Sequence, residues 1–293
     1  MNRTTLFLTI TGVLLAVVLL FSFFLSYKEP KGFVVTATFY PLAYVAQEVG
    51  GEYITVFTIT PPGAEAHHYE PTPRDISRIT RSHLFLMNGG GLDPWADRLL
   101  SSLQESGIPV VVMADRFTTQ DPHFWIDPLF MKEYVEAVRD QLVLLDSKNK
   151  IYYQENAQKL LLALNNLHKE YVIGLSTCSK RDAIVMHEAF GYIEARYGLV
   201  FHSLAGISPE AEPSPRRIAD LADLAREHNI SIIFFETQVS PRVATTIAKE
   251  VGAETRLLHP IESLSKQEKA EGHSYISLMQ KNLQELRKAL ECE

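Results

Sequence analysis

Two kinds of apolar pattern alternate along the chain from Gly32 onward. Short apolar runs are typical of buried strands, and the segments between them repeat apolar residues every three or four positions, as amphipathic helices do. The predicted strands are Phe33–Phe39, Tyr53–Thr60, Leu84–Asn88, Pro109–Ala114, Ala183–Met186, Val200–Leu204, Ser231–Phe235 and Thr255–Leu258. The predicted helices around them are Leu42–Val49, Asp75–Arg81, Pro94–Glu105, Phe190–Tyr197, Pro215–Glu227, Pro241–Val251 and Ser274–Leu290. This alternation predicts an α/β fold with mostly parallel sheets covered by helices.

A longer helix, Asn149–Leu175, is predicted between the two series of strands. Its apolar stripe consists of Tyr153, Ala157, Leu160, Leu164, Leu167, Tyr171 and Leu175. At about 1.5 Å per residue such a helix spans about 40 Å. We therefore expect two similar lobes, residues 32–148 and 176–293, joined by one rigid linker helix at 149–175. A rigid connection predicts small lobe movements rather than wide closure.

Residues 1–31 have a different composition from the rest of the chain. The run Leu6–Leu25 is nearly all apolar, and the next charge is Lys28. A run of this length can span a membrane core of about 30 Å, whereas the apolar part of a secretory signal is usually about 7–15 residues. We expect an uncleaved membrane anchor, with a cleaved signal peptide as the alternative. Either segment predicts that the body of the chain is extracytoplasmic, at the cell surface or in the periplasm.

Charge and cysteine content narrow the classes of function. The formal net charge of −7 and the lack of a basic run disfavour nucleic acid as a partner. The two cysteines, Cys178 and Cys292, lack the spacing of a metal-binding pair. They could form a disulfide outside the cytoplasm, and the sequence leaves this open.

Candidate metal ligands occur in four segments, each of which lies at or after the end of a predicted strand. The segments are 61–71, 121–128, 185–192 and 259–264, and they contain His67, His123, His187 and Glu262. Ligands of open α/β sheets bind beyond the carboxyl ends of the strands, so two facing lobes would bring these segments together. One histidine after a strand is usually only a hydrogen-bonded loop residue. The joint placement of three favours a site for a transition metal, since imidazole and carboxylate are zinc ligands.

The same segments resemble the metal-specific solute-binding proteins of ABC importers, the cluster A-I family of zinc- and manganese-binding lipoproteins. The resemblance runs from about Val34 to the C-terminus. Its motifs are Phe39-Tyr40-Pro41-Leu42, Gly63 with His67-x-Tyr69-Glu70-Pro71, Asp121-Pro122-His123-x-Trp125-x-Asp127-Pro128, His187-Glu188-Ala189-Phe190-Gly191-Tyr192 and Pro260-Ile261-Glu262-Ser263-Leu264. Membership implies two α/β lobes joined by a rigid helix, one metal ion in the cleft between them, and delivery to a membrane permease.

The resemblance also assigns ligands. By their places in the motifs, His67, His123 and His187 are expected ligands, and Glu262 is the expected fourth, with Glu236 as its rival. Four other acidic residues, Glu65, Glu70, Asp127 and Glu188, are expected to support the histidines or the local structure.

Zinc is the expected metal and manganese the alternative. Manganese-binding relatives typically have a carboxylate at the position of His187, which makes a harder site. One feature departs from the zinc-specific pattern, because the segment Met113–Gln120 lacks the histidine-rich loop that such relatives often carry.

The expected function is high-affinity capture of zinc outside the cytoplasm by a monomer that delivers the ion to an ABC permease. A manganese-binding homologue or a metal-dependent adhesin is the alternative. A zinc hydrolase is disfavoured, because the sequence has neither a His-Glu-x-x-His nor a Gly-x-Ser-x-Gly motif. Four protein ligands would indicate binding, whereas three ligands and a water would indicate catalysis.

Overall fold

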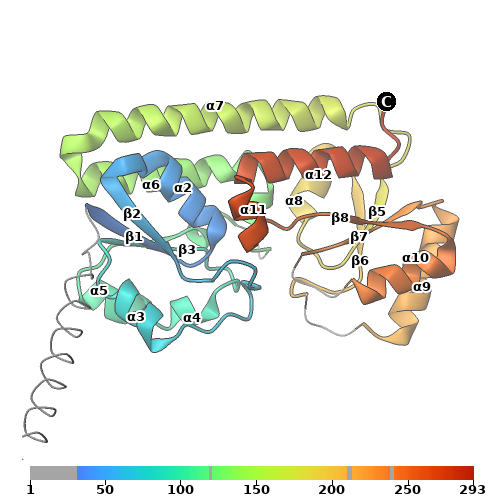
Figure 1. Cartoon of the computed structure of the whole chain (residues 1–293), viewed down its shortest axis with the longest axis horizontal. Coiled ribbons are helices and arrows are strands. Elements are labelled where there is room, and N and C mark those ends of the chain that lie inside the picture. Colours follow the sequence, from blue (N-terminus) through green and yellow to red (C-terminus); the bar gives the residue numbers. More distant parts are fainter. Residues whose placement is uncertain (1–31, 119–120, 210–212, 238–240) are drawn as a thin grey trace, which may run out of the picture.

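The computed structural model describes residues 32–118, 121–209, 213–237 and 241–293, which form two α/β lobes beneath one long helix (Figure 1). The expected anchor or signal segment, residues 1–31, lies outside the described residues. Within the described ranges, no helix is both long enough and apolar enough to cross a membrane.

Each lobe contains one parallel sheet, and the two sheets have the same arrangement. The strands are β1 Phe33–Ala37, β2 Ile54–Thr58, β3 Leu84–Met87, β4 Val110–Val112, β5 Asp182–Val185, β6 Val200–Ser203, β7 Ile232–Phe235 and β8 Glu254–Leu257. Their orders are β2-β1-β3-β4 and β6-β5-β7-β8, so the first strand of each lobe pairs with both the second and the third. The predicted fold class, with two similar mostly parallel lobes, is confirmed.

Helices cover these sheets, and most lie where the sequence pattern predicts them. They are α2 Tyr40–Gly50, α3 Pro73–Ile79, α4 Pro94–Asp97, α5 Leu100–Glu105, α6 Phe130–Leu145, α7 Lys150–Gly174, α8 Gly191–Tyr197, α9 Pro215–Glu227, α10 Arg242–Val251, α11 Lys266–Ala270 and α12 Tyr275–Ala289. The single helix predicted at Pro94–Glu105 is wrong, because α4 and α5 are separate helices with Arg98 and Leu99 between them. Helices α6 and α11 were not predicted.

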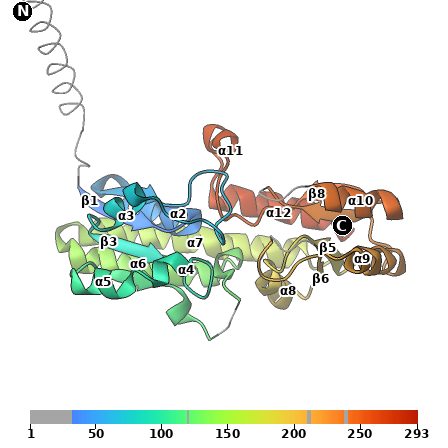
Figure 2. The same cartoon turned by 90° about the horizontal axis from the view of Figure 1, so that it is seen from below.

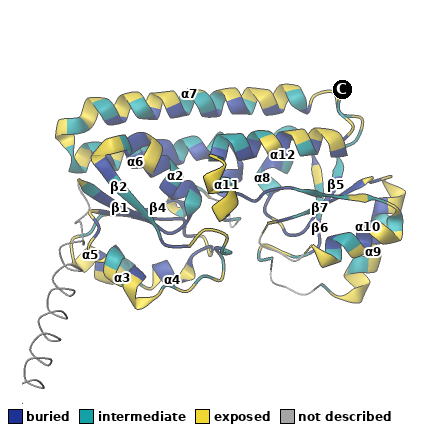
Figure 3. Cartoon of the chain, viewed as in Figure 1, coloured by how far each residue is buried: buried dark blue, intermediate teal, exposed yellow. Residues whose placement is uncertain are grey.

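The long helix α7 lies across both lobes (Figures 1 and 2). It packs on α2 and α6 in the first lobe and on α12 in the second. The whole predicted apolar stripe of this helix is buried against the lobes, while the opposite side of the helix is exposed to solvent (Figure 3). The stripe belongs to one apolar core that includes Leu42 of the first lobe and Ile193 and Leu286 of the second. The lobes are therefore held together by a shared core as well as by the chain.

A buried hydrogen bond fixes α7 to α12. The hydroxyl of Tyr171 donates to the carbonyl oxygen of Met279 at 2.7 Å, and the Tyr171 side chain is fully buried. We expect Tyr171→Phe to lower the free energy of unfolding by about 1 kcal/mol, because one buried hydrogen bond is lost while the ring still packs. Urea unfolding of the two proteins measures this difference. A Tyr171→Phe variant as stable as the wild type would show that this bond does not help to hold α12 on α7.

A disulfide joins Cys178, just after α7, to Cys292 at the C-terminus. This answers the question that the sequence left open. The bond ties the last residues of the chain to the end of the long helix, where Figure 1 places the C-terminus. It closes a loop with a sequence separation of 114 residues, which contains most of the second lobe.

Candidate metal centre

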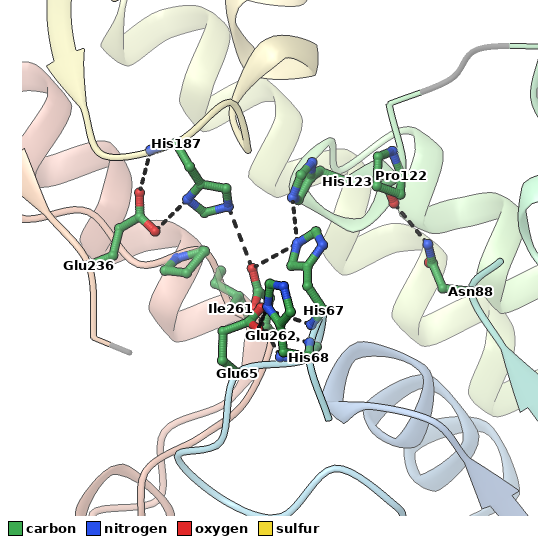
Figure 4. Close-up of polar contacts among 12 residues, drawn as sticks. Glu65, His67, His68, Asn88, Pro122, His123, His187, Glu236, Ile261 and Glu262 are labelled. Carbon is green, nitrogen blue, oxygen red and sulfur yellow. Dashed lines mark hydrogen bonds and ion pairs between the residues drawn. The ribbon is translucent and has the colours of Figure 1, made fainter. Parts of the chain in front are cut away.

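Four side chains from four loops meet between the lobes (Figure 4). His67 follows β2 and His123 lies after β4, whereas His187 follows β5 and Glu262 follows β8. Each lobe thus contributes two residues. One nitrogen of each histidine and one carboxylate oxygen of Glu262 all lie within 4.8 Å of one another. The structure brings together all four residues that the sequence singled out.

The separations of these atoms are comparable with, or longer than, the edges of a tetrahedron around zinc. The Nε2 atoms of His67 and His123 are 3.2 Å apart. Glu262 Oε1 lies 3.9 Å from His67 Nε2 and 3.7 Å from His187 Nε2. Zinc bonds of about 2.0–2.1 Å in tetrahedral geometry put neighbouring ligand atoms about 3.3 Å apart. The cluster would therefore contract around a bound zinc ion, with Glu262 moving closer to His67 and His187.

Buried polar atoms of this cluster, on His187 and Glu262, have no hydrogen-bond partner within the described residues. His123 and His187 are 0% exposed and Glu262 is 1% exposed. Within the described residues, His187 Nε2 and Glu262 Oε1 make no hydrogen bond. Buried polar groups without hydrogen bonds are costly, at about 1–3 kcal/mol each. A cation between them would satisfy both atoms, so the residues present fit a metal ion.

Two carboxylates orient the rings of His123 and His187 by contacting their Nδ1 atoms. Asp121 Oδ1 lies 2.7 Å from His123 Nδ1, and Glu236 Oε2 lies 2.6 Å from His187 Nδ1. Each ring therefore turns its Nε2 toward the cluster. Outer carboxylates of this kind fix the tautomer and direction of metal-binding histidines. Glu236 is not part of the four-residue group, and it lies on the far side of His187 from Glu262 (Figure 4).

The four acidic residues that were expected to support the histidines or the local structure make hydrogen bonds to the surrounding structure. Glu65 accepts hydrogen bonds from the backbone N–H groups of His67 and His68 and so shapes their loop. The other three accept bonds away from the histidine rings: Glu70 from Arg98, Asp127 from Leu129 and Arg196, and Glu188 from Ser203. They stabilise the surrounding structure, while Asp121, which the sequence reading missed, supports a ring. The Asp-x-His spacing of Asp121 and His123 was its only signal.

His259, whose role was also missed, holds the loop that carries Glu262. Ile261 has φ +60°, a left-handed conformation that is unfavourable for a β-branched residue. Its N–H donates to His259 Nδ1 at 2.8 Å, and Asn282 accepts from the His259 N–H. His259 Nε2 lies 3.2 Å from Glu268. These contacts hold the strained loop, which turns Glu262 toward the first lobe.

Trp125 packs beside the site and connects the lobes. Its ring lies 5.2 Å from that of His123, and its indole N–H donates to the carbonyl oxygen of Pro260 at 2.7 Å. The Tyr275 hydroxyl in turn donates to the Trp125 carbonyl oxygen at 2.6 Å. Trp125 is fully buried, as expected of a wall that excludes water. A cavity of about 380 Å³, lined partly by Asp121, His187 and Glu188, borders the cluster.

Burial governs the protonation of the cluster. It lowers the pKa of His67 to about 3, with further lowering from His123 and His187, and it also lowers the pKa of His123. Burial raises the pKa of Glu262 to about 8, although His187 opposes the shift. For His187, burial is the largest effect and would lower the pKa, but the bond to Glu236 and the charges of Glu236, Glu262 and Glu65 together outweigh it and raise the pKa. The nitrogens of His67 and His123 are thus kept unprotonated and available to a metal.

Known proteins with similar sequences include zinc-uptake and zinc-binding proteins. The high-affinity zinc uptake system protein ZnuA of Bacillus subtilis is 34% identical over 285 residues, which are 90% of this chain and 89% of that protein. The zinc-binding lipoprotein AdcA of Streptococcus pneumoniae is 30% identical over 280 residues. That alignment covers 88% of this chain but only 56% of AdcA, so the chain spans about half of that longer protein.

Solved structures of similar proteins have the same fold. The Zn(II)-bound ZnuA-like domain of Streptococcus pneumoniae AdcA matches with a TM-score of 0.80 and 30% identity, over 89% of this chain and 99% of that domain. The laminin-binding protein Lmb of Streptococcus agalactiae, described as bifunctional with adhesin and metal transporting activity, matches with a TM-score of 0.81 and 31% identity, over 88% of this chain and 100% of Lmb. The family described as zinc-uptake complex component A, periplasmic, matches residues 35–289. The chain belongs to this family of zinc-uptake components.

Proposed function

We propose that this protein captures a zinc ion outside the cytoplasm and delivers it to an ABC-type permease, with His67, His123, His187 and Glu262 as the ligands. The observation that carries the proposal is the buried cluster of three nitrogens and one oxygen, all within 4.8 Å of one another. The zinc-uptake and zinc-binding relatives support the choice of cargo.

The donor set favours zinc over manganese. Three imidazole nitrogens make a borderline-soft site, whereas manganese is better suited by oxygen ligands. Four protein ligands also complete a tetrahedral zinc shell, and this closed arrangement is typical of binding rather than of catalysis. The buried position of Glu262 therefore supports capture over hydrolysis.

Capture and release would both depend on the boundary between the lobes. His67 and His123 are supplied by one lobe and His187 and Glu262 by the other, so the shell is complete only when both are in place. The shared core beneath α7 opposes wide opening. We propose that the permease releases the ion by shifting the loops around the cluster, and that the bordering cavity is the route by which zinc leaves.

Adhesion is the weaker candidate. It would rest on the laminin-binding relatives alone. The metal cluster, in contrast, is a property of this chain's own geometry.

Metal analysis of the purified full-length protein tests the function. After exposure to equal zinc and manganese followed by dialysis, we expect one tightly held zinc ion per chain and little manganese. Zinc should also raise the melting temperature, since a ligand present at about 1,000 times its Kd adds about 4 kcal/mol to stability. Retention of manganese instead, or of no metal with an unchanged melting temperature, would contradict the proposal.

A further inference from the structure

A second cluster of metal-binding side chains lies in the second lobe, away from the cleft. Asp182, His202 and His228 each offer one ligand atom, and these atoms all lie within 4.8 Å of one another. Asp182 is the first residue of β5, whereas His187 of the cleft comes after the carboxyl end of the same strand. The two clusters are therefore at opposite ends of β5 and share no residue.

The fold itself places these three residues together. His202 on β6 pairs with Ile184 on β5. Because side chains alternate along a strand, Asp182 and Ile184 point to the same face of the sheet. Helix α9 packs on this face, since Ile184, Leu221 and Ala225 belong to one core cluster. His228 caps the C-terminal end of α9 and so reaches the two strand residues.

The carboxylate of Asp182 joins the two imidazoles. Its Oδ1 lies 2.9 Å from His202 Nε2 and 3.2 Å from His228 Nδ1. The two rings are 5.7 Å apart between centroids. The side chains of Asp182, His202 and His228 are 25%, 21% and 38% exposed, so an ion could enter from solvent and water could complete its shell.

The electrostatic surroundings also favour a cation. Three nearby basic residues have partners: Lys180 contacts Glu291, Arg226 contacts Asp223 and Glu250, and Arg181 donates to the carbonyl oxygen of Leu175. The C-terminal end of a helix adds a partial negative charge.

We propose that Asp182, His202 and His228 form a second, solvent-accessible site for a zinc-type divalent ion. Two imidazoles and one carboxylate suit copper, nickel and zinc, and disfavour magnesium, calcium and manganese. Three partly exposed ligands hold an ion less tightly than four buried ones. The second site therefore fills only at zinc concentrations above those that fill the cleft.

Calorimetric titration of the full-length, metal-free protein with zinc tests this site. The wild type should show two classes of binding, one tight and one weaker. His202→Ala and His228→Ala should each remove the weaker class and leave the tight one. His273→Ala is the matched control, because His273 is a partly buried histidine of the same lobe outside the cluster, and it should keep both classes.

Two further variants make the outcome decisive. Asp182→Asn keeps the size of the side chain and should weaken the second class by about tenfold, with circular dichroism confirming the fold. His123→Ala should lose the tight class and keep the weaker one, which separates this proposal from the function of the cleft. A single class in the wild type, or a weaker class that persists in folded His202→Ala and His228→Ala, would overturn the proposal.

Discussion

Replacing His123 with alanine is expected to lower the affinity for zinc by about a thousandfold. Buried zinc sites with four ligands bind with about 10–16 kcal/mol, so one ligand accounts for about 2.5–4 kcal/mol, and the upper end of this range corresponds to about a thousandfold in affinity. His123 is fully buried and its Nδ1 is held by Asp121, so no nearby side chain can replace it without rearrangement. His67→Ala and His187→Ala are expected to have effects of similar size. Competition with a chelator of known zinc affinity measures each loss.

His68→Ala is the matched control for these variants. His68 is next to His67 in sequence, but its side chain is 44% exposed and contacts Glu65 rather than the cluster. Its replacement should leave zinc affinity within about twofold, as is usual for exposed positions. If His123→Ala bound zinc as tightly as His68→Ala does, the ligand assignment would be wrong.

Glu262→Ala is expected to lower the affinity for zinc more than Glu236→Ala does, because Glu262 is a ligand and Glu236 only orients one. Glu262 offers an oxygen within 4 Å of two Nε2 atoms, so its loss should weaken zinc binding by about a hundredfold or more. Glu236 contacts the His187 ring at Nδ1 and accepts a hydrogen bond from the His187 backbone N–H, and loss of such a support typically costs about 10–100-fold. The same chelator competition measures both, and Glu262→Ala should be the weaker binder.

Spectra of the cobalt-loaded variants would separate the two roles independently of affinity. Glu236→Ala should keep four-coordinate cobalt with the same ligands, because only an orienting contact is removed. Glu262→Ala should change the ligand field, because a ligand is replaced by water. The reverse pattern would identify Glu236 as the ligand.

Most of the fold could be predicted because strands have clear signals. All eight predicted strands exist. The central strands β1, β3, β5 and β7 are short, mostly buried apolar runs, whereas edge strands such as β6 and β8 are more exposed. Helix α6 was missed although Met131, Tyr134, Val138 and Leu142 repeat at helical spacing and are buried. Its start has no capping side chain, as Leu129 makes no such hydrogen bond, so the usual boundary signal was lacking. The break between α4 and α5 has neither glycine nor proline to reveal it.

The four clustered residues could be read from their motifs, but the residues that position them could not. Whether Glu236 or Glu262 faces the cluster depends on side-chain direction, which is set by the left-handed turn at Ile261 and by His259. His259 and Asn282 are 23 positions apart, and Trp125 and Pro260 are 135 apart. Contacts of this range depend on tertiary packing, which no local pattern encodes.

The core that runs beneath α7 makes the two lobes dependent on each other despite their matching strand orders. Neither half could be cut out as a module, because each would expose to water the apolar surface that it now shares. A packing change in one lobe can therefore move ligands supplied by the other. Selection on the metal-binding residues must act on the chain as a whole, and the likeness of its halves does not make them interchangeable.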